Sequence, residues 1–421
     1  MEDDKLMKTR RTAFIISLLL CILLSRDPNL QRLVQLPDHL RLNQVTPEFS
    51  GYWSHIIKVE KIPLQQSVPV STTNLAGLEQ FQVVYKLFGI FPLKSSQVEV
   101  MPSINLMPGG QSIGVTLQTK GVMVVGQSPI LDSSGRKIYP AREAGIEVGD
   151  VLLKIDNKEV HTDQEVSFAV NSAGRHNGSA TVIFKHRNQI LEKALKPIYC
   201  VETGRYRVGL FVRDEAAGVG TLSFVDPVSK GYGALGHVIT DADTNQQIEV
   251  SEGKIMASTI YAIEKGKRGH PGEKIGSFVV NSPFSGTIEK NTLTGIFGKL
   301  NGQTLNPYFK EPIPVGWETD IKIGPAKIYT VIHGEKIEEF NVKIERVMYN
   351  RTDSKNMIVR VTDPRLLAAT GGIIQGMSGS PIVQDGKLIG AITHVFVNDA
   401  SRGYGVFVQN MLNEMNTKKA A

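Results

Sequence analysis

Two serines near the C-terminus stand in a sequence setting that suits acyl transfer. Residues 375–383 read Gln-Gly-Met-Ser-Gly-Ser-Pro-Ile-Val, and an Asp-Gly turn and an apolar strand follow. A serine nucleophile needs an accessible hydroxyl on a tight turn and two backbone N–H groups that stabilise the oxyanion. Gly376 can turn its N–H inward, so the amides of Gly376 and Ser378 are the predicted oxyanion hole. Ser380 is the competing nucleophile, but Ser378 is preferred because the residue two before Ser380 is not a glycine. A flexible turn between two strands is the non-catalytic alternative.

The base for this serine must be a histidine, and His237 is preferred among the nine in the chain. It lies between a glycine-rich turn and an apolar strand, in the segment 232–240, Tyr-Gly-Ala-Leu-Gly-His-Val-Ile-Thr. A neutral imidazole near its normal pKa can accept the serine proton and return it to the leaving amine. His394 is the runner-up, because it follows the serine's own strand, and His333 and His270 are predicted to lie in loops.

Several aspartates could complete a triad by orienting the imidazole. Asp363 is preferred because it keeps the chain order His, Asp, Ser. It also directly precedes Pro364, where an aspartate is well suited to N-cap a short helix, so a purely structural role is the alternative. Four other aspartates compete with it: Asp241, Asp243, Asp320 and Asp399.

A second pattern indicates a peptide-binding module ahead of the histidine and serine. Residues 141–156 follow A-x-x-A-G-I-x-x-G-D-x-L-x-x-I-D, which is typical of PDZ domains, and an amphipathic helix at 164–173 and a strand at 180–187 are predicted after it. Exposed backbone N–H groups of such a domain bind a peptide's terminal carboxylate, and a free strand edge accepts the peptide as an added strand. The loop predicted to bind the carboxylate consists of Ser112, Ile113, Gly114 and Val115. An ordinary small β domain is the alternative.

The N-terminus is predicted to be a signal peptide or an uncleaved signal anchor. Four basic residues within residues 1–11 precede an apolar run at 13–24. The run is about half as long as a comfortable bilayer span, and no small-x-small cleavage site directly follows it. We therefore expect export across the cytoplasmic membrane, with membrane association through residues 13–24 if the segment is retained.

Composition limits the remaining possibilities. The chain has 421 residues, of which 41% are hydrophobic and 21% charged, so more than one globular domain is expected. Forty glycines, 20 prolines and little helical periodicity favour a mainly β fold. The net charge of +6 comes without a Lys/Arg block, which argues against nucleic-acid binding. Cys21 and Cys200 can build neither a disulfide framework nor a metal site, so no metal or cofactor is expected.

Together, the signal segment, the PDZ pattern and the Gly-His-Val-Ile and Gly-Met-Ser-Gly-Ser-Pro segments resemble the stage IV sporulation protein B peptidases of endospore-forming bacteria. The resemblance implies a trypsin-like double β-barrel in which His237, Asp363 and Ser378 are the catalytic residues. It also implies export from the forespore into the space between the two forespore membranes. There such proteins trigger a proteolytic cascade that activates a late mother-cell sigma factor.

The predicted organisation is a signal segment at 1–28, a spacer and small β-rich region at 29–97, a PDZ domain at 98–198 and a serine peptidase domain at 199–415. The expected function is a signalling endopeptidase that cleaves the exposed ectodomain of a membrane protein and cleaves its own N-terminal segment. The PDZ domain would bind a substrate or a partner. A non-catalytic PDZ scaffold with a peptidase-like fold is the alternative. An HtrA-type quality-control protease is a third reading, which the order of the two domains disfavours.

Overall fold

The computed structural model describes most of the chain from residue 33 to residue 417. The residues described are 33, 36, 38–42, 53–63, 79–100, 103–132, 134–187, 189–279, 282–302 and 306–417. None of the helices in these ranges is both long and apolar enough to cross a bilayer. The predicted signal segment, residues 1–28, lies outside the described residues.

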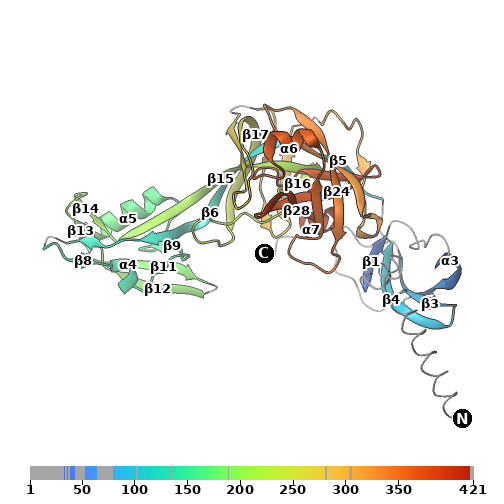
Figure 1. Ribbon diagram of the computed structural model, residues 1–421. Helices are drawn as coiled ribbons and strands as arrows, with labels where there is room; N and C mark the ends of the chain where they lie inside the picture. The colour runs from blue at the N-terminus through green and yellow to red at the C-terminus, as the bar shows by residue number, and fades with distance from the viewer. Residues whose placement is uncertain are drawn as a thin grey trace, which may run out of the picture.

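Two six-stranded β-barrels form the body of the molecule (Figure 1). The second barrel closes in the order β23-β24-β25-β28-β27-β26. Its strands are β23 (Gly324–Val331), β24 (Ile337–Val347), β25 (Met357–Val361), β26 (Pro381–Gln384), β27 (Lys387–Phe396) and β28 (Asp399–Phe407). Branched side chains that suit strands fill its interior, among them the fully buried Ile328, Ile344 and Val359. The turn η1 (Glu318–Asp320) and the helices α6 (Pro364–Thr370) and α7 (Val408–Asn416) pack around it.

The first barrel closes because β15 pairs back with β6 in the ring β6-β17-β19-β21-β16-β15. Its strands are β6 (Ser112–Gln127), β15 (Leu210–Val225), β16 (Gly231–Ala234), β17 (Val250–Glu264), β19 (Ser285–Thr287) and β21 (Gly295–Asn301). Four short strands extend this sheet: β5 (Asn105–Pro108), β18 (Glu273–Phe278), β20 (Lys290–Thr292) and β22 (Ile313–Pro314). Alternate residues of β6, namely Ile113, Val115 and Leu117, are buried in the core of this barrel, as the two-residue period of a strand requires. The predicted trypsin-like double barrel is therefore confirmed.

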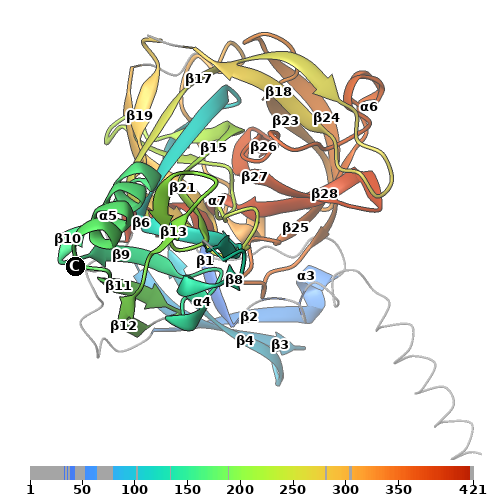
Figure 2. The same cartoon turned by 90° about the vertical axis from the view of Figure 1, so that its left-hand side faces the viewer.

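The strands β6 and β15 continue beyond the barrel as an antiparallel ribbon, and the predicted PDZ domain is built on its far end (Figures 1 and 2). Its other strands are β7 (Ile130–Leu131), β8 (Lys137–Ile138), β9 (Val151–Ile155), β10 (Lys158–Glu159), β11 (Ala180–His186), β12 (Gln189–Leu195), β13 (Ile198–Cys200) and β14 (Arg205–Arg207). Its helices are α4 (Pro140–Glu143) and α5 (Asp163–His176). The hydroxyl of Thr162 caps α5 by accepting from the Glu165 amide at 3.1 Å. The PDZ domain is thus an insertion between two strands of the first barrel.

A break in the alternation of β6 allows this one strand to serve two cores. Leu117 is buried in the barrel, whereas Val122 and Val124 are buried in the PDZ domain, so the inward-facing positions change from odd to even numbers. Gly121 lies between them with a φ of +94°, and the pairing with β15 shifts register at Arg213/Glu215. A bulge of this kind rotates the following residues to the other face of the strand.

This arrangement corrects two of the sequence predictions. Ser112, Ile113, Gly114 and Val115 do not form a carboxylate-binding loop: they belong to β6, with β15 paired on one edge and β17 on the other. All four are buried, so no edge is open to a peptide there. The predicted boundary at residue 198/199 also fails, because residues 112–119 complete the first barrel of the peptidase fold.

A separate four-stranded sheet precedes the barrels, in the order β1-β4-β3-β2. Its elements are β1 (His39–Leu42), α3 (Trp53–Ile56), β2 (Ile57–Pro63), β3 (Glu79–Leu87) and β4 (Phe91–Val100). The side chains of Phe81, Val83 and Tyr85 alternate along β3 and are buried in a small core of their own. This sheet begins inside the predicted β-rich region at 29–97 and runs three residues past its end, to Val100.

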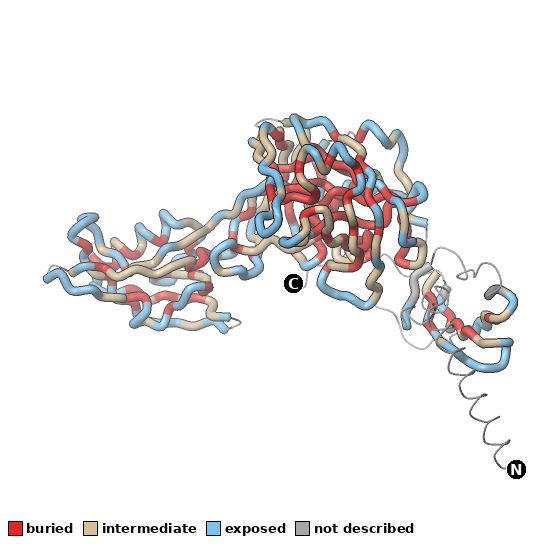
Figure 3. Tube along the Cα trace, in the orientation of Figure 1, coloured by how far each residue is buried: buried red, intermediate tan, exposed pale blue. Residues whose placement is uncertain are grey.

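A continuous apolar cluster joins the two barrels. Figure 3 shows that buried residues run through the whole two-barrel body. Phe224 and Phe297 of the first barrel pack in one cluster with Trp317, Tyr329 and residues of α7. Burial of each such aromatic side chain is worth about 2–3 kcal/mol, so the barrels are held together as one body.

The insertion of the PDZ domain predicts how fragments of the chain behave. A fragment of residues 103–417 should fold with a cooperative thermal transition, whereas a fragment of residues 199–417 should not. The shorter fragment lacks β6 and leaves the apolar core of the first barrel open. Circular dichroism melting of the two fragments tests this, and a cooperative transition for residues 199–417 would contradict the shared-strand topology.

Candidate active site

A cavity of about 950 Å³ lies between the two barrels and contains the predicted nucleophile and base. His237 reaches it from the turn after β16 in the first barrel, and Ser378 from the turn before β26 in the second. Thr393 and His394 of β27 and residues 213 and 215–219 of β15 also line it. The structure therefore brings Ser378 and His237, 141 positions apart in the sequence, into one cavity.

The two candidate serines differ sharply in accessibility. Ser378 is partly exposed and lines the cavity, and its hydroxyl donates to the Thr393 carbonyl at 2.6 Å. Ser380 is fully buried, and its hydroxyl donates to the Met377 carbonyl at 2.6 Å. Gly379 between them has a φ of +95°, and a Cβ there would lie 1.9 Å from the Thr221 carbonyl oxygen. Only glycine fits this turn, which is the turn that presents Ser378 and hides Ser380.

The backbone before Ser378 is held by strand β18 of the first barrel. The Lys274 amide donates to the Gln375 carbonyl at 3.0 Å. Since the C=O and N–H of a trans peptide point in opposite directions, the N–H of Gly376 is directed away from β18. Within the described residues, the amides of Gly376 and Ser378 donate to no protein acceptor. Two unpaired N–H groups thus accompany Ser378, as the predicted oxyanion hole requires.

A buried threonine ties the same turn to strand β15. The amide of Thr221 donates to the Ser378 carbonyl at 3.0 Å, and its hydroxyl donates to the Gly376 carbonyl at 2.7 Å. Behind it, the ammonium group of Lys274 lies 3.3 Å from the Thr221 hydroxyl and 2.8 Å from the Thr330 hydroxyl. The stem of Lys274 packs against Gly376, where an added Cβ would lie 3.1 Å away.

Lys274 is unusual because it is only 5% exposed and, within the described part of the chain, its ammonium group contacts two hydroxyls but forms no ion pair. Burial lowers the pKa of its side chain to about 7, because the surroundings disfavour the charged form. A buried lysine without a carboxylate partner costs stability, so its place beneath the serine turn points to a functional role. The sequence around Lys274, Gly-Glu-Lys-Ile-Gly, carried no signal that could have singled it out.

His237 is presented by a turn in which Leu235 and Gly236 both have positive φ, +67° and +73°. Its Nδ1 lies 2.8 Å from the Val238 carbonyl oxygen. A carbonyl can only accept, so Nδ1 carries the proton and Nε2 is left as a base. Burial lowers the pKa of His237, while the bond to Val238 acts in the opposite direction. The imidazole is therefore neutral at neutral pH.

His394, the runner-up base, stands beside His237. The centroids of the two rings are 4.8 Å apart, and both rings line the cavity. Burial, together with repulsion from His237, lowers the pKa of His394 to about 4. Both neighbouring imidazoles therefore resist protonation near neutral pH, in a cavity that Arg213, Glu215 and Asp241 also line.

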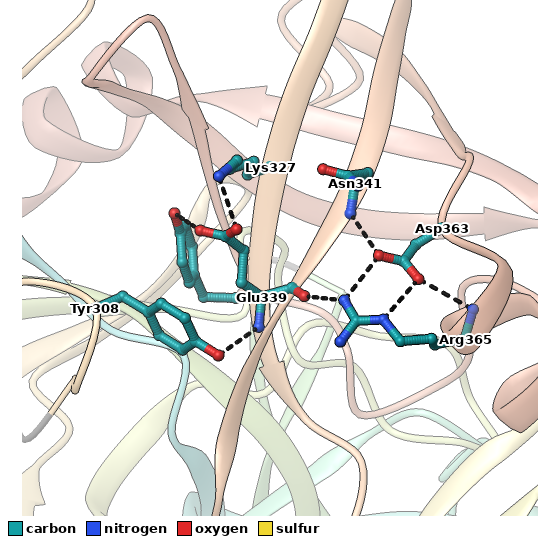
Figure 4. A network of polar contacts seen from close by, with 7 residues as sticks. Tyr308, Lys327, Glu339, Asn341, Asp363 and Arg365 are labelled. Atoms are coloured by element: carbon teal, nitrogen blue, oxygen red, sulfur yellow. Dashed lines mark hydrogen bonds and ion pairs between the residues drawn. The ribbon is translucent and has the colours of Figure 1, made fainter.

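The structure does not place Asp363 in this cavity. Asp363 ends the segment after β25 and caps α6 by accepting from the Arg365 amide at 3.0 Å. Its carboxylate also accepts from the Arg365 guanidinium, at 2.9 and 3.1 Å, and from the Asn341 amide at 3.2 Å (Figure 4). The Arg365 guanidinium lowers the pKa of Asp363. This carboxylate is thus satisfied within the second barrel, and the N-capping alternative describes its observed contacts.

Figure 4 shows how far that structural role extends. The Arg365 guanidinium also donates to the Glu339 carbonyl at 2.7 Å, and the Glu339 carboxylate accepts from Lys327 at 2.7 Å and from Tyr329 at 2.8 Å. The network therefore joins α6 to β23 and β24 on the wall of the second barrel.

Among the competing aspartates, Asp241 alone lines the cavity. Its carboxylate is bound by the Arg213 guanidinium at 2.6 Å and by the amides of Asp243 and Thr244. Asp243 pairs with the same arginine, Asp320 with Lys387, and Asp399 accepts from Ser401. Among the described residues, the His237 ring is hydrogen-bonded to a backbone carbonyl, that of Val238, and to none of these carboxylates.

Comparison with known proteins agrees with this geometry. Residues 204–412 match the family model described as SpoIVB peptidase S55, and residues 132–178 match a PDZ domain model. A putative zinc metalloprotease of Clostridium perfringens is 38% identical over 71 residues, which are 17% of this chain and 20% of that protein. The chain thus spans about a fifth of the length of that curated relative.

Solved structures with similar architecture include two bacterial proteases. The Rv3671c protease of M. tuberculosis in its active form is 13% identical, covers 49% of this chain and 77% of its own, and has a TM-score of 0.29. The HtrA-type protease AlgW with a decapeptide is 11% identical, covers 49% and 53%, and has a TM-score of 0.27. The PDZ domain of an SdrC-like protein from Listeria monocytogenes is 20% identical, covers 22% and 87%, and has a TM-score of 0.18.

The fold assignment rests on the strand pairings of the chain itself, which close two six-stranded barrels around the cavity. Together with the two family matches, they show that the chain belongs to the SpoIVB peptidase S55 family and contains a PDZ domain.

Proposed function

We propose that Ser378 is the nucleophile and His237 the general base of this peptidase. The observation that carries the proposal is that the two residues come from different barrels and line one cavity, whereas Ser380 is buried and bonded. The proton on Nδ1 of His237 leaves Nε2 free to accept the serine proton. His394 lies beside this pair, and its pKa of about 4 keeps its ring neutral.

The reaction follows from this arrangement. The Ser378 hydroxyl turns away from the Thr393 carbonyl, gives its proton to Nε2 of His237, and its oxygen attacks the scissile carbonyl carbon. The amides of Gly376 and Ser378 stabilise the oxyanion. His237 then protonates the leaving amine, and a water hydrolyses the acyl-enzyme by the same steps in reverse order. Each oxyanion donor contributes a factor on the order of 10²–10³ in rate.

Thr221 and Lys274 support this hole from behind. The backbone bond from Lys274 to Gln375 sets the direction of the Gly376 N–H, and the Thr221 hydroxyl holds the next carbonyl. Lys274 in turn holds the Thr221 hydroxyl. Both are positioning residues, since neither side chain lines the cavity.

The imidazole is oriented by the Val238 carbonyl rather than by a carboxylate. This follows from the 2.8 Å contact at Nδ1 and from the full engagement of Asp363 with Arg365 and Asn341. A carbonyl fixes the tautomer as an aspartate would, but it stabilises the imidazolium less, because it carries no full charge.

The biological substrate is proposed to be the exposed ectodomain of a membrane protein, cleaved as a signalling step in sporulation. Membership of the SpoIVB peptidase family supports this role. The apolar run at residues 13–24 supports export across the cytoplasmic membrane, and the resemblance stated above favours the forespore intermembrane space. The chain's own N-terminal segment is a second proposed substrate, because tethering keeps it near the active site.

A fluorophosphonate probe, which needs only an activated serine and an oxyanion hole, tests the identity of the nucleophile. The wild-type chain should be labelled at Ser378. Ser378→Ala should lower the labelling rate by a factor on the order of 10⁴ or more. Ser380→Ala is the matched control: it should label within about tenfold of wild type and lose about 1 kcal/mol of stability, because one buried hydrogen bond is removed. Labelling of Ser378→Ala at Ser380, read by peptide mass spectrometry, would refute the assignment.

Replacement of Asp363 separates a structural from a catalytic role. Asp363→Ala removes an N-cap and leaves Arg365 without its partner, so the free energy of unfolding should fall by about 2–4 kcal/mol. Labelling by the same probe, per folded molecule, should stay within about tenfold of wild type. Denaturant melts give the first quantity and labelling kinetics the second. Loss of labelling at unchanged stability would instead make Asp363 a catalytic residue.

A further inference from the structure

Strand β15 belongs at once to the PDZ domain and to the catalytic cavity. Leu210 and Val212, at its start, pack against the PDZ core. Residues 213 and 215–219, further along the same strand, line the cavity that holds Ser378 and His237. Figure 1 shows β15 running from beside α5 into the first barrel without a break. Strand β15 therefore connects the PDZ domain directly to the cavity that contains Ser378 and His237.

One edge of this strand is open. The edge facing β6 is paired from Leu210 to Thr221, but the opposite edge pairs with β16 only from Leu222 onward. In the described part of the chain, no strand covers that second edge over residues 210–219. These ten residues are all exposed or partly exposed, whereas the last six residues of β15 are buried. An uncovered strand edge presents N–H and C=O groups to which another strand can add.

Helix α5 lies along the PDZ part of this edge. Its first residue, Asp163, donates its amide to the Asp214 carboxylate at 3.0 Å. Near its other end, Asn171 accepts from the Tyr206 amide at 3.1 Å. The helix therefore runs antiparallel to the chain from 206 to 214, and the half-buried Ala169 packs on the same PDZ core as Leu210 and Val212. Helix α5 and the unpaired edge of β15 therefore lie side by side, and Ala169, Leu210 and Val212 supply apolar side chains there.

The residues just before β15 are suited to binding a carboxylate. Arg205 and Arg207 are exposed in β14, immediately before the turn at Gly209, whose φ is +73°. The Val208 carbonyl accepts from the Ala141 amide at 3.2 Å, so the next N–H, that of Gly209, points to the opposite side of the peptide. Positive charge and a directed backbone N–H favour the terminal carboxylate of a peptide at this place.

We propose that the membrane-protein substrate of this peptidase is bound through an extended C-terminal segment that adds to the free edge of β15, with its terminal carboxylate at Gly209 and its scissile bond at Ser378. Cleavage of the chain's own N-terminal segment, which carries no terminal carboxylate, does not use this edge. The carboxylate end sets the direction: the segment runs antiparallel to β15, so its upstream residues lie toward the cavity. This inference rests on Ser378 as the nucleophile. The PDZ domain then acts as the distal part of the active site rather than as a separate adaptor.

The length of the strand fixes where the substrate is cut. Gly220 lies next to the serine turn, and the following residue, Thr221, donates to the Ser378 carbonyl. Ten residues separate Leu210 from Gly220, which at roughly 3.3 Å per residue is about 33 Å. A substrate strand paired along this length is cleaved about 8–12 residues before its C-terminus.

A peptide library tests whether cleavage occurs at this fixed distance from a free C-terminus. Random-sequence peptides of about 25 residues are prepared in two forms, with a free or an amidated C-terminus, and digested with the protein, and the cut positions are read by mass spectrometry. For free carboxylates we expect cuts concentrated about 8–12 residues from the end, several-fold above other positions. Amidation should remove the concentration. Cut positions spread evenly in both sets would overturn the proposal.

Variants separate this proposal from the assignment of the nucleophile. Ala169→Arg places a bulky side chain between α5 and the strand edge and should abolish the positional preference. Ser167→Arg, on the exposed part of the same helix, is the matched control and should keep it. If Ser378→Ala still cuts the library, the assignment of Ser378 fails. If Ser378→Ala is inactive but Ala169→Arg cuts with the wild-type preference, the assignment stands and the β15 proposal alone is refuted.

Discussion

The pairing of β6 with β15 is the interaction on which the rest of this molecule depends. It closes the first barrel, and beyond the barrel the same two strands begin the PDZ domain. A bulge at Gly121 allows β6 to bury odd-numbered residues in one core and even-numbered residues in the other. Two domains that share a continuous ribbon cannot move independently as domains on a flexible linker do. Under the proposed function, recognition by the PDZ domain and chemistry at Ser378 are therefore coupled by secondary structure.

A second constraint lies at the junction of the barrels, where the polar side chains of Thr221 and Lys274 are buried and hydrogen-bonded. Thr221 holds the serine turn through both its amide and its hydroxyl, and Lys274 holds that hydroxyl and the Gln375 carbonyl. Burying the amine of Lys274 costs free energy, and the lowered pKa of this side chain reflects that cost. An apolar side chain at this position would avoid it. In the proposed mechanism this cost is offset, because rigid oxyanion donors contribute to the rate.

Local sequence patterns predicted what depends on local conformation. Glycines around Ser378 and before His237 are needed for positive φ, and the structure shows such values at Gly376, Gly379 and Gly236. The PDZ pattern at 141–156 likewise encodes a short helix, turns and a strand, which the structure contains. The nine-residue segments around the histidine and the serine could thus be recognised without knowing what faces them.

Features that depend on contacts between distant segments could not be predicted in this way. A glycine before alternating apolar residues occurs both at the peptide-binding loop of a PDZ domain and in a barrel strand, so the sequence predicts a carboxylate-binding loop at residues 112–115 where the structure has strand β6. Asp363 fits both the chain order of a triad and the position of an N-cap before Pro364, and its pairing with Arg365 becomes visible only in three dimensions. Lys274 stands in an ordinary strand sequence, and its burial follows from the closure of two barrels over it.

Hydrogen–deuterium exchange of Ser378→Ala tests most directly whether β15 unites the two sites. The protein would be measured alone and with a saturating free-carboxylate peptide that the wild type cleaves. The account predicts slower exchange along the whole of residues 210–219 and in the turn 375–378, and less protection when the same peptide is amidated. Protection confined to 375–378 and 215–219, with 210–213 unchanged, would contradict it.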